Sequence, residues 1–408
     1  VGVGEVKYTP LENKKAKGEN MADTILILGN GFDIAMGRKT KYTDFIDFEK
    51  QLFSNPDERL QEFLEVKNIR IEKYRDNLYL KFINDNKDKL GENWSNLEIM
   101  ISQLADAILF FKENSKVLSE CIGSDYYPYF NDVLEDTNNY TAKRYVAKVF
   151  EDEILDEELD NYKKELFIEN LNELFTKKLD LLIELLEIYL SYLNYLDFEV
   201  QAIEARPTAL DALSDLSNSY VLNFNYTNTS GNIYGTSEDK THFIHGRIDL
   251  DRTFNRVNTM VFGIEDKEND VNSAIIPYQK YYQRIVKETG NKFEKFFKVT
   301  HFTENINIPS RGISVPYTKK TSKNIVIFGH SVDPLDKEIF QKCFALAEEG
   351  GYLYRFIFTY LDEPAKRSII KNLAIILGKE KLIELTGKRN VVFIKSDDKD
   401  GMKEVLLP

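Results

Sequence analysis

Two side chains with the chemistry of a catalytic site stand at the ends of apolar runs that have strand character. Asn225 lies near the end of SYVLNFNY (219–226), and His245 lies near the end of THFIHG (241–246). An asparagine amide can accept and donate hydrogen bonds, and an imidazole exchanges a proton near neutral pH. Together they could hold a hydroxyl group or a water molecule and take its proton. Asn225 and His245 are therefore the candidate catalytic residues.

A glycine turn ends another apolar run. The segment ILILGNGFDIAMG (25–37) passes from strand character into Gly29, Asn30 and Gly31. A strand that enters a glycine turn and then a helix commonly exposes backbone N–H groups to a phosphate. It is also a common tight turn. On the phosphate interpretation, Gly31→Val should abolish ligand binding and leave the fold largely intact, because the branched side chain would stand where the ligand meets the backbone.

Further polar residues and glycines follow the same apolar runs. Ligands of parallel α/β sheets bind beyond the carboxyl ends of the strands, so these residues are expected to share one cleft. The candidate ligand-binding residues are Gly29, Asn30, Gly31, Phe32, Asp33, Tyr226, Thr227, Gly329, His330, Ser331 and Asp336.

Several of these residues also have a purely structural interpretation. Asp333 before Pro334 is typical of a helix N-cap. Asn225 and Thr227 could stabilise a loop through side-chain hydrogen bonds to the backbone, and His245 could be a satisfied buried histidine. His242 lies three residues before His245, which would point the two rings to opposite faces of a strand. We therefore expect no metal site.

The elements that must position these residues are read from the apolar runs. The predicted strands are 24–29, 219–226, 241–246, 324–329, 352–360 and 390–395. Near-continuous apolar runs are typical of parallel strands that are covered on both faces. The last three runs alternate with helical segments. The sequence therefore predicts an α/β fold, with a Rossmann-like, doubly wound, mostly parallel sheet.

A long helical region interrupts this pattern. There is no glycine between Gly123 and Gly231, and leucines recur there at helical spacings. We predict a Rossmann-like α/β domain from residues 21–42 and 217–408, with an all-helical insertion at 43–216. Residues 1–20 are polar, and we interpret them as a leader or vector-derived tail.

Composition narrows the class of partner. The formal net charge is -13, whereas proteins that bind nucleic acid usually carry a basic excess, so nucleic acid is not the expected main partner. Cys121 and Cys343 are far apart and lack metal-ligand spacing. The most apolar stretch, 179–196, is interrupted by acidic residues and fits an amphipathic helix better than a membrane span. We expect a cytoplasmic location.

Five motifs carry a family resemblance. They are ILGNGFDIAMGRKTKYTDF (27–45), NWSNLE (93–98), NFNYTNT (223–229), HFIHG (242–246) and IFGHSVDPLD (327–336). In this order they resemble the motifs of the AbiH family, bacterial proteins associated with abortive infection by phage. The resemblance extends over about residues 24–395. Met36 stands where the family pattern often has histidine, and we assign no chemistry to that position.

The same motifs are distantly similar to those of sirtuin-like NAD-binding and NAD-hydrolysing domains. The order of the strand ends and their glycines agrees, whereas Asp33, Asn223 and Thr227 depart from the sirtuin-like pattern. The resemblance implies NAD as substrate or ligand, with no further cofactor required. A carboxylate at Asp33 would repel a pyrophosphate unless it pointed to a ribose hydroxyl or capped the next helix.

Three functions remain open at this point. The first is hydrolysis of NAD or a related nucleotide as the output of an anti-phage system. The second is a metal-dependent nuclease or phosphodiesterase that uses Asp33, Asp333 or Asp336. The third is a non-catalytic nucleotide sensor that signals through the helical insertion. A second copy of the chain and a phage-derived activator are candidate partners.

Overall fold

The protein is built around a parallel β-sheet. The computed structural model describes residues 23–86, 94–114, 139–154, 161–254, 256–264, 275–299, 301–308 and 313–408. The strands of the sheet are β1 (Asp23–Leu28), β2 (Tyr220–Asn223), β3 (Thr241–Phe243), β6 (Lys323–Phe328), β7 (Tyr354–Tyr360) and β8 (Val391–Lys395). Their order is β3-β2-β1-β6-β7-β8, and every neighbouring pair is parallel. The predicted α/β, Rossmann-like class is confirmed.

The sheet is covered on both faces, as its apolar runs predict. Ile25 and Ile27 of β1 face one hydrophobic core, which contains α12 (Lys337–Glu349) and α13 (Glu363–Leu377). Leu26 and Leu28 face a second core, which contains α15 (Lys399–Val405). Side chains of a strand alternate between the two faces, so only a continuous apolar run satisfies both cores.

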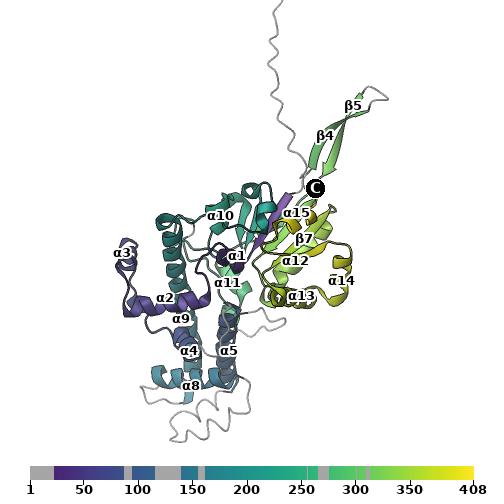
Figure 1. The fold of residues 1–408 in the computed structure, drawn as a ribbon. Coiled ribbons are helices and arrows are strands. Elements are labelled where there is room, and N and C mark those ends of the chain that lie inside the picture. Colours follow the sequence, from purple (N-terminus) through teal and green to yellow (C-terminus); the bar gives the residue numbers. More distant parts are fainter. Residues whose placement is uncertain are drawn as a thin grey trace, which may run out of the picture.

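The helical region between β1 and β2 lies to one side of the sheet (Figure 1). It has a hydrophobic core of its own. Its α-helices among the described residues, after the short α1 (Asn30–Ala35), are α2 (Tyr42–Ser54), α3 (Glu58–Val66), α4 (Leu78–Asn86), α5 (Trp94–Glu113), α8 (Tyr140–Ile154) and α9 (Asn161–Asn194). The described part of residues 145–205 contains no strand, as a helical insertion requires. The boundaries at residues 42 and 216 stay a prediction.

The chain between β3 and β6 contributes to both parts of the protein. Met260, Phe262 and Tyr278 pack into the core of the helical region, whereas Phe293 packs under the sheet. The short helix α11 (Lys280–Val286) lies between Tyr278 and Phe293 in the chain. Residues beyond the end of a sheet strand are thus brought against the helical insertion, which matters for the site described below.

Some elements differ from the predicted ones. Strand β2 ends at Asn223, earlier than predicted, because the Asn223 amide donates a hydrogen bond to the Thr227 carbonyl and its oxygen accepts one from the Asn225 N–H. The hairpin of β4 (His301–Ile308) and β5 (Ile313–Lys320) was not predicted, and it projects from the molecule (Figure 1). The remaining α-helices of the described chain are α10 (Thr229–Tyr234) and α14 (Lys379–Gly387).

The remaining expectations concern residues 1–20, the two cysteines and a membrane span. Residues 1–20 and Cys121 lie outside the described residues. Cys343 of α12 is a buried free thiol that faces the core between this helix and the sheet. Across the part of the chain that the structure describes, no helix combines the length and the apolar character needed to cross a bilayer.

Candidate functional site

A cavity of about 540 Å³ lies beyond the carboxyl ends of the central strands. It opens where the chain order reverses, since β1 has β2 on one side and β6 on the other. Twelve of the thirteen predicted site residues line it: Gly29, Asn30, Gly31, Asp33, Asn225, Tyr226, Thr227, His245, Gly329, His330, Ser331 and Asp336. Phe32 does not line it, because its ring packs edge-on against Phe328 in the core. The structure thus brings the four predicted strand ends together.

The two glycine turns pack directly on each other at the base of the cavity. The Gly31 N–H donates to the Gly329 carbonyl over 2.8 Å, and the Gly29 N–H donates to the Phe328 carbonyl over 3.0 Å. A Cβ atom on Gly31 would lie 2.7 Å from Gly329 Cα, closer than non-bonded carbons approach. The glycines are therefore needed for the approach of backbone to backbone.

This contact corrects one prediction. Gly31→Val cannot leave the fold largely intact, because its side chain would collide with the turn after β6 rather than with a ligand alone. The N–H groups of Gly29, Gly31 and Phe32 also donate to carbonyl groups of these turns, so they are not directed at a phosphate. A ligand could contact this turn only through atoms other than these three N–H groups.

The loop after β6 fixes the orientation of His330. Gly329 has φ +68°, and Val332 has φ +55°, a conformation that is rare for a β-branched residue. In this loop the Val332 N–H donates to His330 Nδ1 over 2.8 Å. His330 Nε2 therefore carries the proton, and it faces Asp336 Oδ2 at 3.6 Å. The strained loop directs an N–H group at the Asp336 carboxylate.

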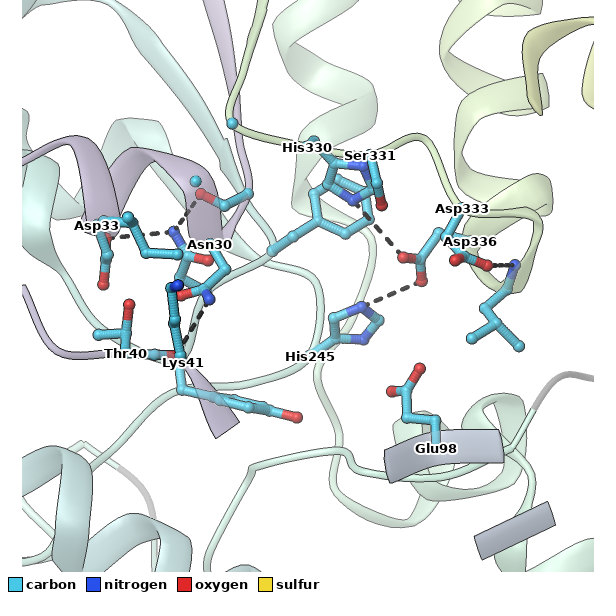
Figure 2. A pocket seen from close by; sticks show the side chains of 18 of the residues that line it. Asn30, Asp33, Thr40, Lys41, Glu98, His245, His330, Ser331, Asp333 and Asp336 are labelled. Atoms are coloured by element: carbon cyan, nitrogen blue, oxygen red, sulfur yellow. Dashed lines mark hydrogen bonds and ion pairs between the residues drawn. The ribbon is translucent and has the colours of Figure 1, made fainter. Parts of the chain in front are cut away.

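Asp336 is the centre of a buried cluster of charged and titratable groups (Figure 2). His245 Nε2 lies 3.2 Å from Asp336 Oδ1, and Lys280 Nζ lies 3.4 Å from the same oxygen. Lys280 Nζ also lies 3.0 Å from Glu98 Oε1. The ammonium group therefore links a carboxylate of the sheet domain to one of the helical insertion.

The charge state of this cluster follows from burial and pairing. Burial alone would raise the pKa of Asp336, but Lys280, His245 and His330 together hold that pKa well below its usual value. Burial lowers the pKa of His245 to about 4, although Asp336 opposes this shift. At neutral pH the imidazole is thus uncharged, donates through Nε2 and offers a lone pair at Nδ1. That buried Nδ1 has no hydrogen-bond partner among the described residues.

Glu98 and Lys280 were not predicted as site residues. Glu98 belongs to the NWSNLE motif, which had marked the family resemblance without any assigned chemistry. Burial raises the pKa of Glu98 to about 7, and Lys280 opposes that rise. Lys280 lies outside the predicted strands and gives no signal in the sequence. Only the packing of the β3–β6 segment against the insertion brings both groups to the cavity.

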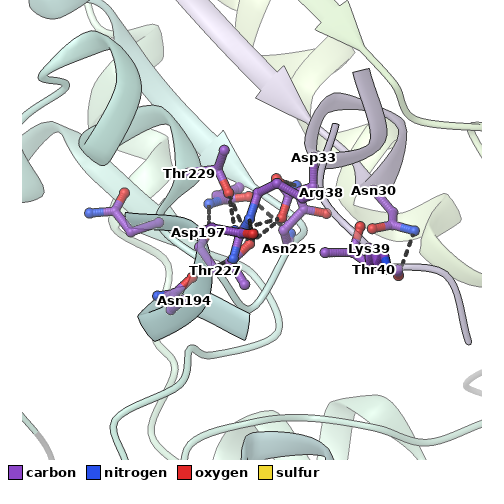
Figure 3. Close-up of polar contacts among 12 residues, drawn as sticks. Asn30, Asp33, Arg38, Lys39, Thr40, Asn194, Asp197, Asn225, Thr227 and Thr229 are labelled. Carbon is purple, nitrogen blue, oxygen red and sulfur yellow. Dashed lines mark hydrogen bonds and ion pairs between the residues drawn. The ribbon is translucent and has the colours of Figure 1, made fainter. Parts of the chain in front are cut away.

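A second buried network lies behind the first glycine turn (Figure 3). The Arg38 guanidinium donates to Asp33 Oδ2 over 3.3 Å and to Asp197 Oδ2 over 2.8 Å. It also donates to Thr229 and to Asn194 at the end of α9. Burial raises the pKa of Asp33, and Arg38 opposes that rise. Arg38 therefore supplies the counter-charge that was missing when Asp33 was considered beside a pyrophosphate.

Asn225 takes part in both the turn and the cavity. Its amide nitrogen donates to the Gly29 carbonyl over 3.1 Å and to Asp33 Oδ1 over 3.3 Å. Its side-chain oxygen has no hydrogen-bond partner among the described residues, so it is available as an acceptor. Thr227 also donates its hydroxyl to Asp33. Toward a ligand, Asn225 thus offers an acceptor, and its donors hold the turn together.

Other predicted residues contribute to the walls of the cavity. The Asn30 amide donates to the Thr40 carbonyl over 3.0 Å, and the Tyr226 hydroxyl donates to the Val261 carbonyl over 2.7 Å. Ser331 is exposed, and its carbonyl accepts from Asn372. Asp333 accepts from the Leu335 N–H, as expected of an N-cap residue.

The two histidines of the THFIHG segment lie in different environments. His242 stacks on Phe293 within the core, and burial lowers its pKa to about 4. It does not line the cavity, whereas His245 does. No group of three or more metal-ligating side chains occurs among the residues that the structure describes.

Comparison with known families bears on this cavity. A family model described as bacteriophage abortive infection AbiH matches residues 25–351. The chain belongs to the AbiH family. The matched range in this AbiH protein runs from β1 through α12, so it includes Gly31, Glu98, His245 and Asp336. No curated protein and no solved structure was found to match the chain.

The contact between the glycine turns can be measured in this AbiH protein with two glycine substitutions. Gly329 and Gly235 both have positive φ, but a Cβ on Gly329 would lie 2.1 Å from Phe32 N, whereas one on Gly235 meets nothing within 4 Å. Both alanine variants should suffer the conformational cost of about 1–2 kcal/mol. In urea denaturation, Gly329→Ala should lose clearly more unfolding free energy than Gly235→Ala. Equal losses would contradict the contact.

The Arg38 network predicts a strong effect on stability. Arg38→Met leaves Asp33 and Asp197 buried beside each other without their cation, and removing one partner of a buried pair costs roughly 3–5 kcal/mol. Lys39→Met changes an exposed neighbour and is the matched control. Thermal unfolding should show a large decrease in melting temperature for Arg38→Met alone. Similar melting temperatures for both variants would show that the network is unimportant.

The burial of His245 predicts a pH dependence with a defined sign. Its pKa is about 4 in the folded protein and about 6.5 in an unfolded chain, so the unfolded chain binds more protons between these values. The contribution of His245 to stability should therefore fall as the pH decreases from about 6.5 to 4. His245→Gln should reduce this dependence, and the His245 resonances should titrate near pH 4 by NMR. Titration near pH 6.5 would contradict the buried neutral imidazole.

Proposed function

We propose that this AbiH protein hydrolyses the N-glycosidic bond of NAD, or of a closely related nucleotide, in the cavity at the sheet edge. The observation that carries the proposal is the position of that cavity. It lies at the switch point of a parallel sheet with the order β3-β2-β1-β6-β7-β8. Dinucleotides bind at this place in doubly wound folds with the same pattern of strand order.

The size and lining of the cavity support a nucleotide-sized ligand. Its volume of about 540 Å³ lies within the range of 300–1,000 Å³ that is usual for small-molecule sites. Its walls combine backbone of the glycine turns with many polar side chains, and Phe224, Leu361 and Ala365 add apolar surface. Polar groups that converge on one cavity can fix the orientation of a ligand.

The polar groups suit the chemistry of N-glycoside cleavage. The bond between ribose C1′ and the nicotinamide nitrogen breaks as positive charge develops on the ribose, so the enzyme must orient the ribose hydroxyls and a water molecule. Asn225 offers a side-chain oxygen as an acceptor. His245 offers the lone pair of Nδ1, held in that tautomer by Asp336. Both are hydrogen-bond acceptors for hydroxyl groups or water.

The carboxylates proposed for a metal-dependent nuclease are arranged differently. Asp33 pairs with Arg38, Asp336 pairs with Lys280, and Asp333 accepts a backbone N–H. A metal would have to compete with a protein cation at two of the three positions. These contacts favour the nucleotide hydrolase over the nuclease. Membership of the AbiH family separately supports a role in abortive infection.

The direct test is to follow nicotinamide release from NAD. The purified protein is incubated with NAD alone and with extract from phage-infected cells, because a phage-derived activator is a candidate partner. Release in either condition would support the proposal. Survival of NAD in both, together with cleavage of DNA or RNA in the presence of Mg²⁺, would replace it with the nuclease function.

Variants of the two candidate catalytic residues should differ in their kinetics. Asn225→Ala removes the acceptor and the donors to Gly29 and Asp33, so both KM and kcat should worsen. His245→Ala should chiefly lower kcat, by roughly 10²- to 10⁴-fold, because it removes an acceptor that holds the attacking water for proton transfer. Asn232→Ala, at an exposed position of α10, is the control. Full activity of His245→Ala would remove its assignment and leave the ligand unchanged.

A further inference from the structure

We propose that Glu98 of the helical insertion is a further catalytic residue, whose carboxylate takes the proton from the water that attacks the ribose. This inference rests on the proposed hydrolysis of an N-glycosidic bond. Glu98 lies on α5, far in sequence from the sheet residues, yet it lines the same cavity as Asn225 and His245. The helical insertion would then complete the active site as well as support it.

The position of the Glu98 carboxylate is fixed by Lys280. Lys280 Nζ lies 3.0 Å from Oε1 and 3.2 Å from Oε2 of Glu98, so the ammonium faces both oxygens. The same ammonium lies 3.4 Å from Asp336 Oδ1. In Figure 2 the Glu98 carboxylate and the His245 ring face a common region, with Asp336 on the other side of the ring. The carboxylate is thus held at a defined place within the cavity.

Proton affinity distinguishes Glu98 from the other bases of the site. Asp336 remains ionised far below neutral pH, because Lys280 and His245 stabilise its charge. His245, with a pKa of about 4, accepts a hydrogen bond but holds a proton poorly at pH 7. The pKa of Glu98 is about 7, because burial disfavours its charged form. General bases work best with a pKa close to the working pH.

The proposed step balances in atoms and charge. The water oxygen forms a bond to ribose C1′, and the bond from C1′ to the nicotinamide nitrogen breaks. The electron pair of that bond neutralises the pyridinium nitrogen, and nicotinamide leaves. The water proton passes to the Glu98 carboxylate, which later releases it to solvent. NAD⁺ and water thereby give ADP-ribose, nicotinamide and a proton.

The surrounding charges favour the same step. Lys280 faces two carboxylates, so the ionised cluster carries an excess of negative charge within a buried site. That excess stabilises the positive charge that develops on the ribose, an effect that is strong where water is excluded. The titratable groups that act on Glu98 are Lys280, Asp336, Asp333 and Tyr226.

The test compares Glu98→Gln with Glu62→Gln, using nicotinamide release from NAD. Glutamine keeps the shape of the side chain and can accept from Lys280, but it cannot take a proton. Glu62 is an exposed residue of α3 in the same helical insertion. We expect kcat to fall roughly 10²- to 10⁴-fold in Glu98→Gln, with little change in KM, and no change in Glu62→Gln. The wild-type rate should rise with pH through a group that titrates near 7, and Glu98→Gln should lose that limb.

Sodium azide distinguishes catalysis from structural support. The azide anion attacks C1′ without a base, so it should restore nicotinamide release by Glu98→Gln and yield ADP-ribosyl azide. A variant that had merely lost its structure would gain nothing from azide.

The outcomes separate the two proposals. If the wild type releases nicotinamide and Glu98→Gln is equally fast, the role of Glu98 is wrong and the hydrolase remains. A slow Glu98→Gln variant that keeps the pH limb and ignores azide would also overturn the role of Glu98. If the wild type releases no nicotinamide, alone or with infected-cell extract, the hydrolase and this inference fail together.

Discussion

The close approach of two backbone turns is the constraint on which the site depends. The turn after β1 and the turn after β6 meet with their glycines facing each other, and no side chain fits between them. This contact sets the distance between the two halves of the sheet edge and the floor of the cavity. Asn225 then joins the third turn to the first through the Gly29 carbonyl. These contacts therefore hold three strand ends in fixed relative positions, and the charged groups of the site lie next to them.

The charged groups come in two sets with different consequences. Around Arg38, one cation faces two carboxylates behind the glycine turn, and its contacts with Asn194 and Asp197 hold the end of α9 and the residues after it against the sheet. Around Lys280, one cation again faces two carboxylates, but this set borders the cavity. Removing charged groups from water is costly, so the carboxylates of each set can be buried only because a cation is buried beside them. In the second set, burial also raises the pKa of Glu98 to about 7, so this carboxyl group can exchange a proton at neutral pH.

Hydrophobic patterning predicted the sheet because both faces of each strand are buried, which forces continuous apolar runs. The strand-end rule then predicted twelve residues of the cavity lining, Asn225 and His245 among them. The two buried cations gave no comparable signal. Lys280 and Arg38 look like surface residues in the sequence, and only tertiary packing buries them. The β4–β5 hairpin was missed because its segments are largely polar and lack the apolar pattern used to find strands. Phe32 was predicted to contact the ligand because it follows the glycine turn in the sequence, but its ring packs in the core.

The strand order has a consequence for how the protein is synthesised. The central strand β1 is among the first described elements to leave the ribosome, yet its neighbour β6 follows about 300 residues later, as the ion pair of Asp23 with Lys323 shows. The helical insertion, whose contacts are more local, can fold while β1 waits. His330, Asp336 and further lining residues as far as Asn372 emerge later still, so no nascent chain that ends before Asn372 can contain the complete cavity. Premature termination before β6 would therefore yield the helical insertion without the site.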